Sequence, residues 1–406
     1  MHGAACPQID ESSLRYPGWR VAAVCFAMAV VCWGFGFYGH SFYLAELQRL
    51  HGWPTSLVSS ASTLYYFVSA VLVVFISDAI RRLGARGCVL VGASSFAAAA
   101  AALPFISTPL QLFAAYLVMA VGWATMSVGA ITNILGQWFE AKRGLAISLA
   151  LNGASLSGVV VVPALVFLAG AAGFKTAMLT GATAILLLMV PLAVTILGQR
   201  PTALAGSQPQ AEANAGGTWT RAAALRSPQF WTVSGAFAIA ILTQAGFLVH
   251  LIAFLEPMTG RNTAGVAVAI TTAMAIVGRL VLGAFADRTN QRWASAVSMA
   301  SQAAALVLMT VTTDANTLLA ACAIYGFSVG NIITFPALII QREFEAASFG
   351  MLIGLSTAIT QFTYAFGPGL LGLVRDLSGT YTTSLLLCVM LNFIAAAIVM
   401  QRPGKT

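Results

Sequence analysis

The sequence predicts an all-α polytopic membrane protein of twelve transmembrane helices in two six-helix halves. Three observations support this prediction: the composition, the spacing of apolar runs and an internal repeat. Of 406 residues, 59% are hydrophobic and 8% are charged, and so little charge cannot cover several soluble domains. Twelve apolar spans of about 20 residues each would instead account for most of the chain. The composition therefore excludes a soluble, collagen-like, disordered or disulfide-scaffold protein.

The positive charge is better explained by membrane topology than by an anionic partner. The net charge is +8 and the pI is near 9.4, but basic residues of a membrane protein collect in its inner loops. We therefore expect a lipid bilayer around the chain and no nucleic acid partner. The six cysteines include no C-x-x-C pair, so neither a disulfide nor a metal site is expected.

Gly, Pro or charged residues separate the apolar runs in chain order. The first run lacks a preceding small-residue cleavage pattern, so we expect it to be retained as a helix. The breaks between runs fall at Arg49, Arg81–Arg86, Pro109, Lys142, Lys175, 199–228, Arg261, Arg288–Arg292, Asp314, Arg342 and Arg375. The predicted spans are 19–43, 55–78, 88–104, 110–137, 144–170, 175–198, 229–255, 263–286, 293–312, 316–340, 348–374 and 380–400.

The loops between these spans predict the orientation. If both termini are inside, inside segments hold fifteen basic residues and outside segments hold four. This excess predicts that both termini are cytoplasmic, with the chain in the plasma membrane, or in the cell inner membrane of a bacterium. The inside residues are Arg15, Arg20, Arg81, Arg82, Arg86, Lys142, Arg143, Arg200, Arg221, Arg226, Arg288, Arg292, Arg342, Arg402 and Lys405.

The one long break between spans has the Pro, Gly and Ser content of a flexible linker. It divides the chain into five parts. These are a cytoplasmic tail (1–18), an N-terminal six-helix half (19–198), a cytoplasmic linker (199–228), a C-terminal six-helix half (229–400) and a cytoplasmic tail (401–406).

The two halves resemble each other. Gly36-Phe37-x-x-His40, followed by Glu46, recurs 210 residues later as Gly246-Phe247-x-x-His250, followed by Glu256. Asp78 and Asp287 are 209 residues apart. Because each pair lies in the same numbered helix of its half, the repeats have parallel topology. Such repeats place a substrate site at the midplane between the halves.

Arg279 is the basic residue that falls inside a span. It lies eight residues before Asp287, which is about 12 Å of helix and close to the middle of a hydrocarbon core of about 30 Å. An arginine at this depth could pair with a carboxylate of a neighbouring helix, but no Asp or Glu of the sequence sits at comparable depth, since Asp78, Asp287, Glu46 and Glu256 fall at helix ends. We therefore favour an anionic substrate as its partner.

His40 and His250 are the other titratable candidates within spans. A histidine can take up a proton in the physiological range, as proton-coupled uptake of a carboxylate requires. A histidine in a helix bundle can equally be a packing residue, and duplication could preserve a structural hydrogen bond. Both interpretations stay open at this point.

Charges at the cytoplasmic ends of spans suggest a gate between the halves. In the C-terminal half, Gly283 is followed by Asp287, Arg288 and Arg292, and these arginines could pair across to the other half. The candidate gate residues are Asp78, Arg81, Arg82, Arg143, Asp287, Arg288 and Arg292.

Motifs of soluble enzymes do not support catalysis here. Gly34-x-Gly36-x-x-Gly39 matches a dinucleotide-binding pattern, but it lies inside an apolar span without a preceding strand. We interpret it as a helix-packing face, like Gly326-x-x-x-Gly330 and Gly350-x-x-x-Gly354. The sequence has no Walker loop, no G-x-S-x-G and no H-E-x-x-H. We expect no cofactor and no enzymatic activity.

Several of these motifs resemble the major facilitator superfamily, and within it the monocarboxylate-transporter and oxalate/formate-antiporter branches. The Gly283–Arg292 pattern is similar to the superfamily's cytoplasmic loop motif. The branch-like segments are Tyr16-Pro17-Gly18-Trp19, Gln137-Trp138-Phe139 with Arg143-Gly144, His250-Leu251, and Gly367-Pro368 leading to Asp376, Gly379 and Tyr381.

The resemblance implies roles for individual residues. Arg279 matches the helix 8 arginine that binds the substrate carboxylate in these carriers, and His40 falls close to their helix 1 proton-coupling pair. Ala275 stands where the monocarboxylate carriers have an aspartate, so their carboxylate relay is absent. Oxalate carriers use a second basic residue in helix 11, whereas that span here has no Lys or Arg, which disfavours a dicarboxylate substrate.

We therefore expect a secondary active transporter of a small organic monocarboxylate, working as a monomer by alternating access, with proton symport favoured. The alternative is an organic anion exchanger without proton coupling. A transporter-like sensor is disfavoured because six residues follow the last span, and a cationic-drug exporter because no carboxylate lies at mid-membrane. Further substrate-binding candidates, from helices expected to line the cavity, are Tyr65, Tyr66, Asn133, Asn152, Asn331, Gln361 and Tyr364.

Overall fold

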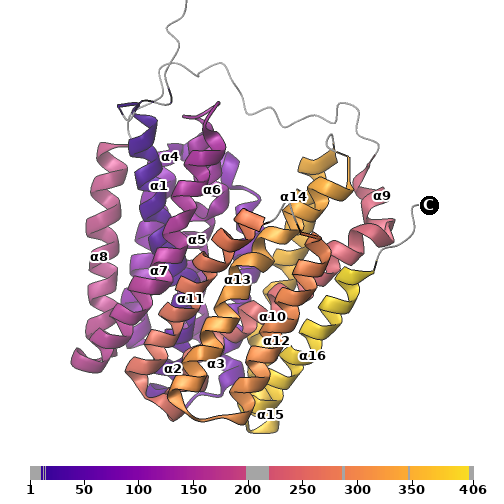
Figure 1. Ribbon diagram of the computed structural model, residues 1–406. Helices are drawn as coiled ribbons and strands as arrows, with labels where there is room; N and C mark the ends of the chain where they lie inside the picture. Colours follow the sequence, from indigo (N-terminus) through magenta and orange to yellow (C-terminus); the bar gives the residue numbers. More distant parts are fainter. Residues whose placement is uncertain are drawn as a thin grey trace, which may run out of the picture.

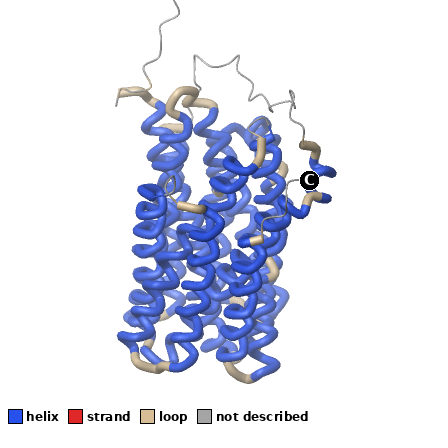
Figure 2. Tube along the Cα trace, turned by 45° about the vertical axis from the view of Figure 1, so that its right-hand side comes forward, coloured by secondary structure: helices blue, strands red, loops and turns tan. Residues whose placement is uncertain are grey.

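The computed structural model describes residues 11, 13, 15–197, 219–285, 289–345 and 348–401. Regular structure in these residues is helical throughout (Figure 2). Twelve helical segments are long and apolar enough to cross a membrane, as the sequence predicts. Figure 1 shows the helices of residues 18–195 gathered beside those of residues 228–400, so that two groups of six spans lie next to each other.

The N-terminal group contains six spans, some built from more than one helical segment. The segments are α1 (Gly18–Trp33), η1 (Gly34–Tyr38), α2 (Gly39–His51), α3 (Thr55–Val73), α4 (Ile76–Ala102), η2 (Leu103–Phe105), α5 (Pro109–Met126), α6 (Val128–Gly136), α7 (Arg143–Ala172) and α8 (Phe174–Thr195).

The C-terminal group repeats this arrangement, preceded by one short helix. The segments are α9 (Arg221–Arg226), α10 (Pro228–Thr259), α11 (Arg261–Phe285), α12 (Gln291–Val311), α13 (Ala315–Glu343), α14 (Phe349–Tyr364), α15 (Gly367–Ser378) and α16 (Tyr381–Met400).

Three details differ from the predicted spans. The first span continues to His51 and contains the π-helical segment η1, rather than ending at residue 43. The charged residues 78–86 belong to α4 rather than to a loop, and Gly84 interrupts that helix with a φ of 73°, a backbone conformation that glycine adopts readily. Part of the predicted linker, residues 199–218, lies outside the described residues, and α9 occupies its last part.

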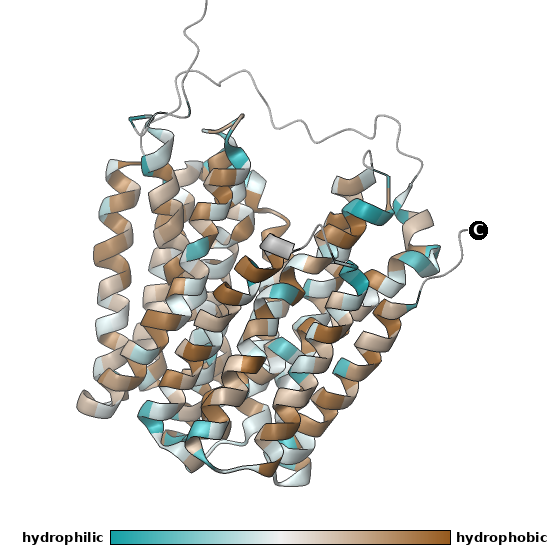
Figure 3. Ribbon diagram, viewed as in Figure 1, coloured by the Kyte–Doolittle hydropathy of each residue, from teal (hydrophilic) through white to brown (hydrophobic). Residues whose placement is uncertain are grey.

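The bundle has two polar ends and an apolar middle (Figure 3). We call the end at which α1 begins the near end, and the end at which α2 passes into α3 the far end. With twelve spans, α16 finishes at the near end. The apolar middle is the surface that a bilayer would cover.

Glycines allow two helices of the C-terminal half to pack closely. A side chain at Gly326 would meet the backbone of Thr271, and one at Gly330 would meet the carbonyl of Ala275. The predicted packing face of α13 against α11 is thus present. The corresponding prediction for Gly354 is wrong, because a Cβ there would meet nothing within 4 Å.

Candidate functional site

The two halves are joined at the far end by buried charge. Glu46 on α2 has 2% of its side chain exposed and pairs with Arg261, the first residue of α11. Arg261 also lies 3.6 Å from the carboxylate of Glu256, and Arg49 pairs with Glu46 at 2.6 Å within its own half. Arg261 is therefore held between two glutamates that the repeat relates, one from each half. We call Glu46, Glu256 and Arg261 the far-end latch.

A second far-end link uses a helix start. Asp376 on α15 accepts hydrogen bonds from the backbone N–H groups of Thr55 (3.2 Å) and Ser56 (2.6 Å) at the start of α3. Pro54 precedes this helix and offers no side-chain cap. A carboxylate of the C-terminal half thus satisfies N–H groups that the helix itself leaves free.

Arg279 lies within α11 at the interface between the halves. Its Nη2 donates a 2.8 Å hydrogen bond to Oγ of Ser155 on α7, in the other half. Its Nε has no hydrogen-bond partner, and none of the ion pairs among the described residues includes it. A half-buried guanidinium with one neutral partner keeps donors free for an anion.

Two predicted site residues are close in sequence to residues that contact Arg279. Gly330 on α13 lies against the Arg279 side chain, and the next residue, Asn331, is buried with its Oδ1 unpartnered. Asn152 precedes Ser155 by one turn on the same face of α7. Asn331 and Asn152, two of the predicted site residues, therefore lie within one helical turn of residues that contact Arg279.

His40 lies at the start of α2, directly after the π-helical η1. Its ring is fully buried, and its Nδ1 lies 2.9 Å from Oγ of Ser62. Its Nε2 has no hydrogen-bond partner. A buried nitrogen without a partner is costly and therefore uncommon in folded proteins. π-Helical turns are frequent at functional sites.

Four tyrosines surround His40, with ring centroids 4.6–5.9 Å from that of the imidazole. We call them the tyrosine cage, and they are Tyr43, Tyr65, Tyr66 and Tyr116. Among the predicted substrate-binding residues, Tyr65 and Tyr66 thus belong to the surroundings of His40, and both are buried. Tyr364 on α14 packs against Tyr66 with 5.2 Å between ring centroids, which brings α14 of the other half to the cage.

His250, the repeat partner of His40, is bonded differently. Its Nε2 lies 2.9 Å from the carbonyl oxygen of Pro368, and its Nδ1 lies 3.3 Å from the Tyr381 hydroxyl. The carbonyl can only accept, so Nε2 carries the hydrogen and Nδ1 is the acceptor. Both nitrogens are occupied within one half, which is the arrangement of a structural histidine.

The remaining predicted site residues are less central. Gln361 lies on α14 one turn before Tyr364 and is partly exposed. Asn133 lies near the end of α6, where it donates to Ser77 at 3.0 Å and accepts from Gln137 at 3.2 Å. The structure therefore places Asn133 with near-end polar residues rather than with Arg279.

The described gate candidates all lie at the near end. Arg292 is buried and forms a bidentate pair with Glu343 at 2.6 and 2.7 Å. It also donates to the Val399 and Gln401 carbonyls and to Thr232, so in this conformation it joins helices of its own half rather than the two halves.

The first-half gate candidates are more exposed. Asp78 and Arg81 form an exposed pair at 2.7 Å within α4. Arg82 is exposed on the same helix, and Arg143 begins α7 beside Gly136. Asp287 and Arg288 lie outside the described residues.

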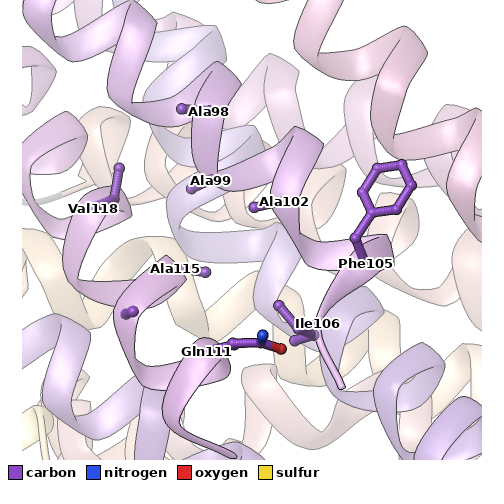
Figure 4. A pocket seen from close by; sticks show the side chains of 9 residues that line it. Ala98, Ala99, Ala102, Phe105, Ile106, Gln111, Ala115 and Val118 are labelled. Atoms are coloured by element: carbon purple, nitrogen blue, oxygen red, sulfur yellow. The ribbon is translucent and has the colours of Figure 1, made fainter. Parts of the chain in front are cut away.

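An apolar groove of about 440 Å³ lies between α4 and α5 near the far end. Figure 4 shows its alanine-rich walls, with Phe105 and Ile106 at the helix connection and Gln111 at one side. No charged residue lines it, so it offers no partner for an anion.

Sequence reasoning missed Ser155, Glu343 and the link between Asp376 and α3. A serine in an apolar span carries no signal of its own. The two glutamates of the far-end latch were visible as a repeat, but that Arg261 lies between them follows only from the packing of the halves.

Comparison with known proteins agrees with this architecture. Residues 24–368 match the family model of the Major Facilitator Superfamily. Monocarboxylate transporter 11 of Mus musculus is 28% identical over 409 residues, covering 95% of this chain and 87% of the relative. The Homo sapiens protein of the same name is 28% identical over 393 residues, covering 91% and 79%.

A solved structure supports the fold. The inward-facing, unoccupied structure of a bacterial homologue of the human lysosomal transporter Spinster has a TM-score of 0.74 to this chain at 13% identity, covering 95% of this chain and 97% of that one. Because the family model spans most of the sequence, this chain belongs to the major facilitator superfamily.

Proposed function

We propose that this protein is a secondary active transporter of a small organic monocarboxylate. The observation that carries the proposal is Arg279, a half-buried cation at the interface of the halves whose one hydrogen-bond partner among the described residues is the neutral Ser155. A single cation suits a single carboxylate. The similarity to proteins named monocarboxylate transporter 11 supports the same substrate class.

The arrangement of the links between the halves supports alternating access. Hydrogen bonds and ion pairs that join the halves, among the described residues, lie between the level of Arg279 and the far end. In our proposal the far end is extracellular and this conformation faces the cytoplasm. Rocking of the halves would break the far-end latch and expose Arg279 to the outside.

We further propose that transport is coupled to a proton carried by His40. Its unpartnered Nε2 lies among tyrosines that reach the other half through Tyr364, whereas both nitrogens of His250 are occupied. A protonated His40 would be stabilised by the negative faces of the surrounding rings. Anion exchange without a proton is the second candidate function.

Uptake into proteoliposomes distinguishes the two. Symport predicts that acidifying the outside accelerates carboxylate uptake several-fold into vesicles that contain no internal anion. His40→Gln should remove this acceleration, while the control His51→Gln, at the end of α2, should retain it. Uptake that depends on internal anion and ignores the pH gradient would instead support the exchanger.

A further inference from the structure

Aromatic rings form a continuous group on the N-terminal half near Arg279. Trp33 and Trp123 have ring centroids 5.0 Å apart, and Phe37 lies 6.5 Å from Trp123 and 6.1 Å from Tyr66. Tyr66 continues the group to Tyr364 on α14 at 5.2 Å. We call these five residues the aromatic wall.

Part of this wall faces the other half of the protein. Trp33 and Phe37 are partly exposed, although the first span is the second most buried of the twelve. Helices α5, α6, α7 and α8 of the same half surround α1, and η1 contacts α10 of the other half. The open sides of Trp33 and Phe37 are therefore directed to the interface and not to lipid.

The wall lies at the level of Arg279. Along α7, Gly153 packs against α1 at Phe26–Val30, and Val161 packs against Gly34. Ser155, which accepts the hydrogen bond from Arg279, lies between these two contacts. Along the bundle axis, at about 1.5 Å per residue, the level of Trp33 is therefore within about one helical turn of the level of the guanidinium.

Tyr38 follows Phe37 at the end of η1. It is buried and adjoins Phe37 with 5.1 Å between ring centroids. Ligand sites typically combine apolar and aromatic walls with a few polar groups that fix orientation. Here one cation and an adjacent aromatic surface occupy the same interface.

From this juxtaposition we infer that the substrate is a monocarboxylate with a flat aromatic body, whose carboxylate pairs with Arg279 while its ring packs against Trp33 and Phe37. This inference rests on the proposed function and specifies its substrate class. Ring-on-ring packing contributes beyond simple burial of apolar area, whereas a methyl or hydroxymethyl group would leave most of the wall uncovered. The protein should therefore select aryl acids over short aliphatic acids.

Calorimetric titration of the purified full chain with phenylacetate and acetate tests the inference. We expect phenylacetate to bind at least tenfold more tightly than acetate. Trp33→Ala should lower phenylacetate affinity about tenfold and leave acetate affinity unchanged, so that the ratio collapses. Trp293→Ala, at a tryptophan that is 58% exposed on α12, is the matched control and should keep the ratio. Phe37→Leu is a second test variant should Trp33→Ala not fold.

The outcomes separate this inference from the proposed function. The aromatic substrate class would be overturned by equal affinity for the two acids, or by an unchanged ratio of phenylacetate to acetate affinity in Trp33→Ala or Phe37→Leu. Acetate binding that depends on Arg279 would then still support a monocarboxylate carrier. Carboxylate binding that survives Arg279→Ala would instead remove the proposed function itself. Tenfold selectivity that is lost only in the wall variants supports the inference.

Discussion

Removing Arg261 should open the far end of the protein. In the structure Arg261 bridges Glu46 of one half and Glu256 of the other, and the Glu46 carboxylate is buried. Arg261→Ala leaves this carboxylate with Arg49 as its remaining basic partner. The variant therefore penalises the conformation in which the far end is closed, because in the opposite conformation water can solvate Glu46.

The size of the effect follows from burial. Removing one partner of a buried ion pair costs about 3–5 kcal/mol. Because Arg49 still pairs with Glu46, we expect about 2 kcal/mol here. That free energy shifts the equilibrium between the two conformations about 30-fold toward the one that is open at the far end.

Distances between spin labels at the far end measure this shift. Ser107 and Thr313 are exposed at the far ends of the two halves, and the five described cysteines are buried, so cysteines placed at these two sites in a Cys6→Ser background can be labelled. Arg261→Ala should increase the population with the longer distance. Arg49→Ala is the matched control, because Arg49 is 51% exposed and bonds within its own half, and should change little. Identical distance distributions for Arg261→Ala and Arg49→Ala would show that Arg261 does not hold the far end closed.

Two further predictions concern stability, measured by thermal unfolding in detergent. Gly330→Val should lower the unfolding midpoint because its side chain would meet the Ala275 carbonyl. The control Gly354→Ala should leave the midpoint unchanged, because the space around Gly354 is open. Equal midpoints for the two variants would contradict the packing of α13 on α11. Arg292→Ala should cost about 3 kcal/mol because it breaks a pair in which the arginine is 3% exposed. The control Arg81→Ala, which removes the exposed pair with Asp78, should lower the stability by less than about 1 kcal/mol. Similar losses of stability in both variants would show that the Arg292 contacts contribute little.

The fold could be predicted from the sequence because a bilayer constrains it strongly. Each span must satisfy its own backbone hydrogen bonds, so apolar length alone marks the twelve helices. The sequence indicated the irregular turns inside helices less clearly. The π-helical turn at Gly34–Tyr38 and the interruption at Gly84 depend on local packing and backbone conformation, and the surrounding sequence remains apolar or helix-forming.

The candidate site could be predicted only in part. Arg279 was recognisable because charge is rare at that depth, and the repeat marked His40 and His250. The sequence could not separate the two histidines, because they differ in their hydrogen-bond partners. The partners of His250 are Pro368 and Tyr381, which lie more than a hundred residues further along the chain. Nor could it show that Arg292 bonds to Glu343 within one half, since positive charge at a span end also has a topological explanation.

The proposed role of Arg279 in binding the substrate carboxylate can be tested with two ligands that match in shape and differ in charge. Calorimetry should compare a carboxylate with its neutral amide on the native chain and on Arg279→Ala, with Arg81→Ala as an exposed-arginine control. We predict that the native protein and the control prefer the carboxylate at least tenfold, and that Arg279→Ala binds both ligands equally weakly. If an Arg279→Ala protein folds and keeps the preference for the carboxylate, Arg279 is not the carboxylate-binding residue.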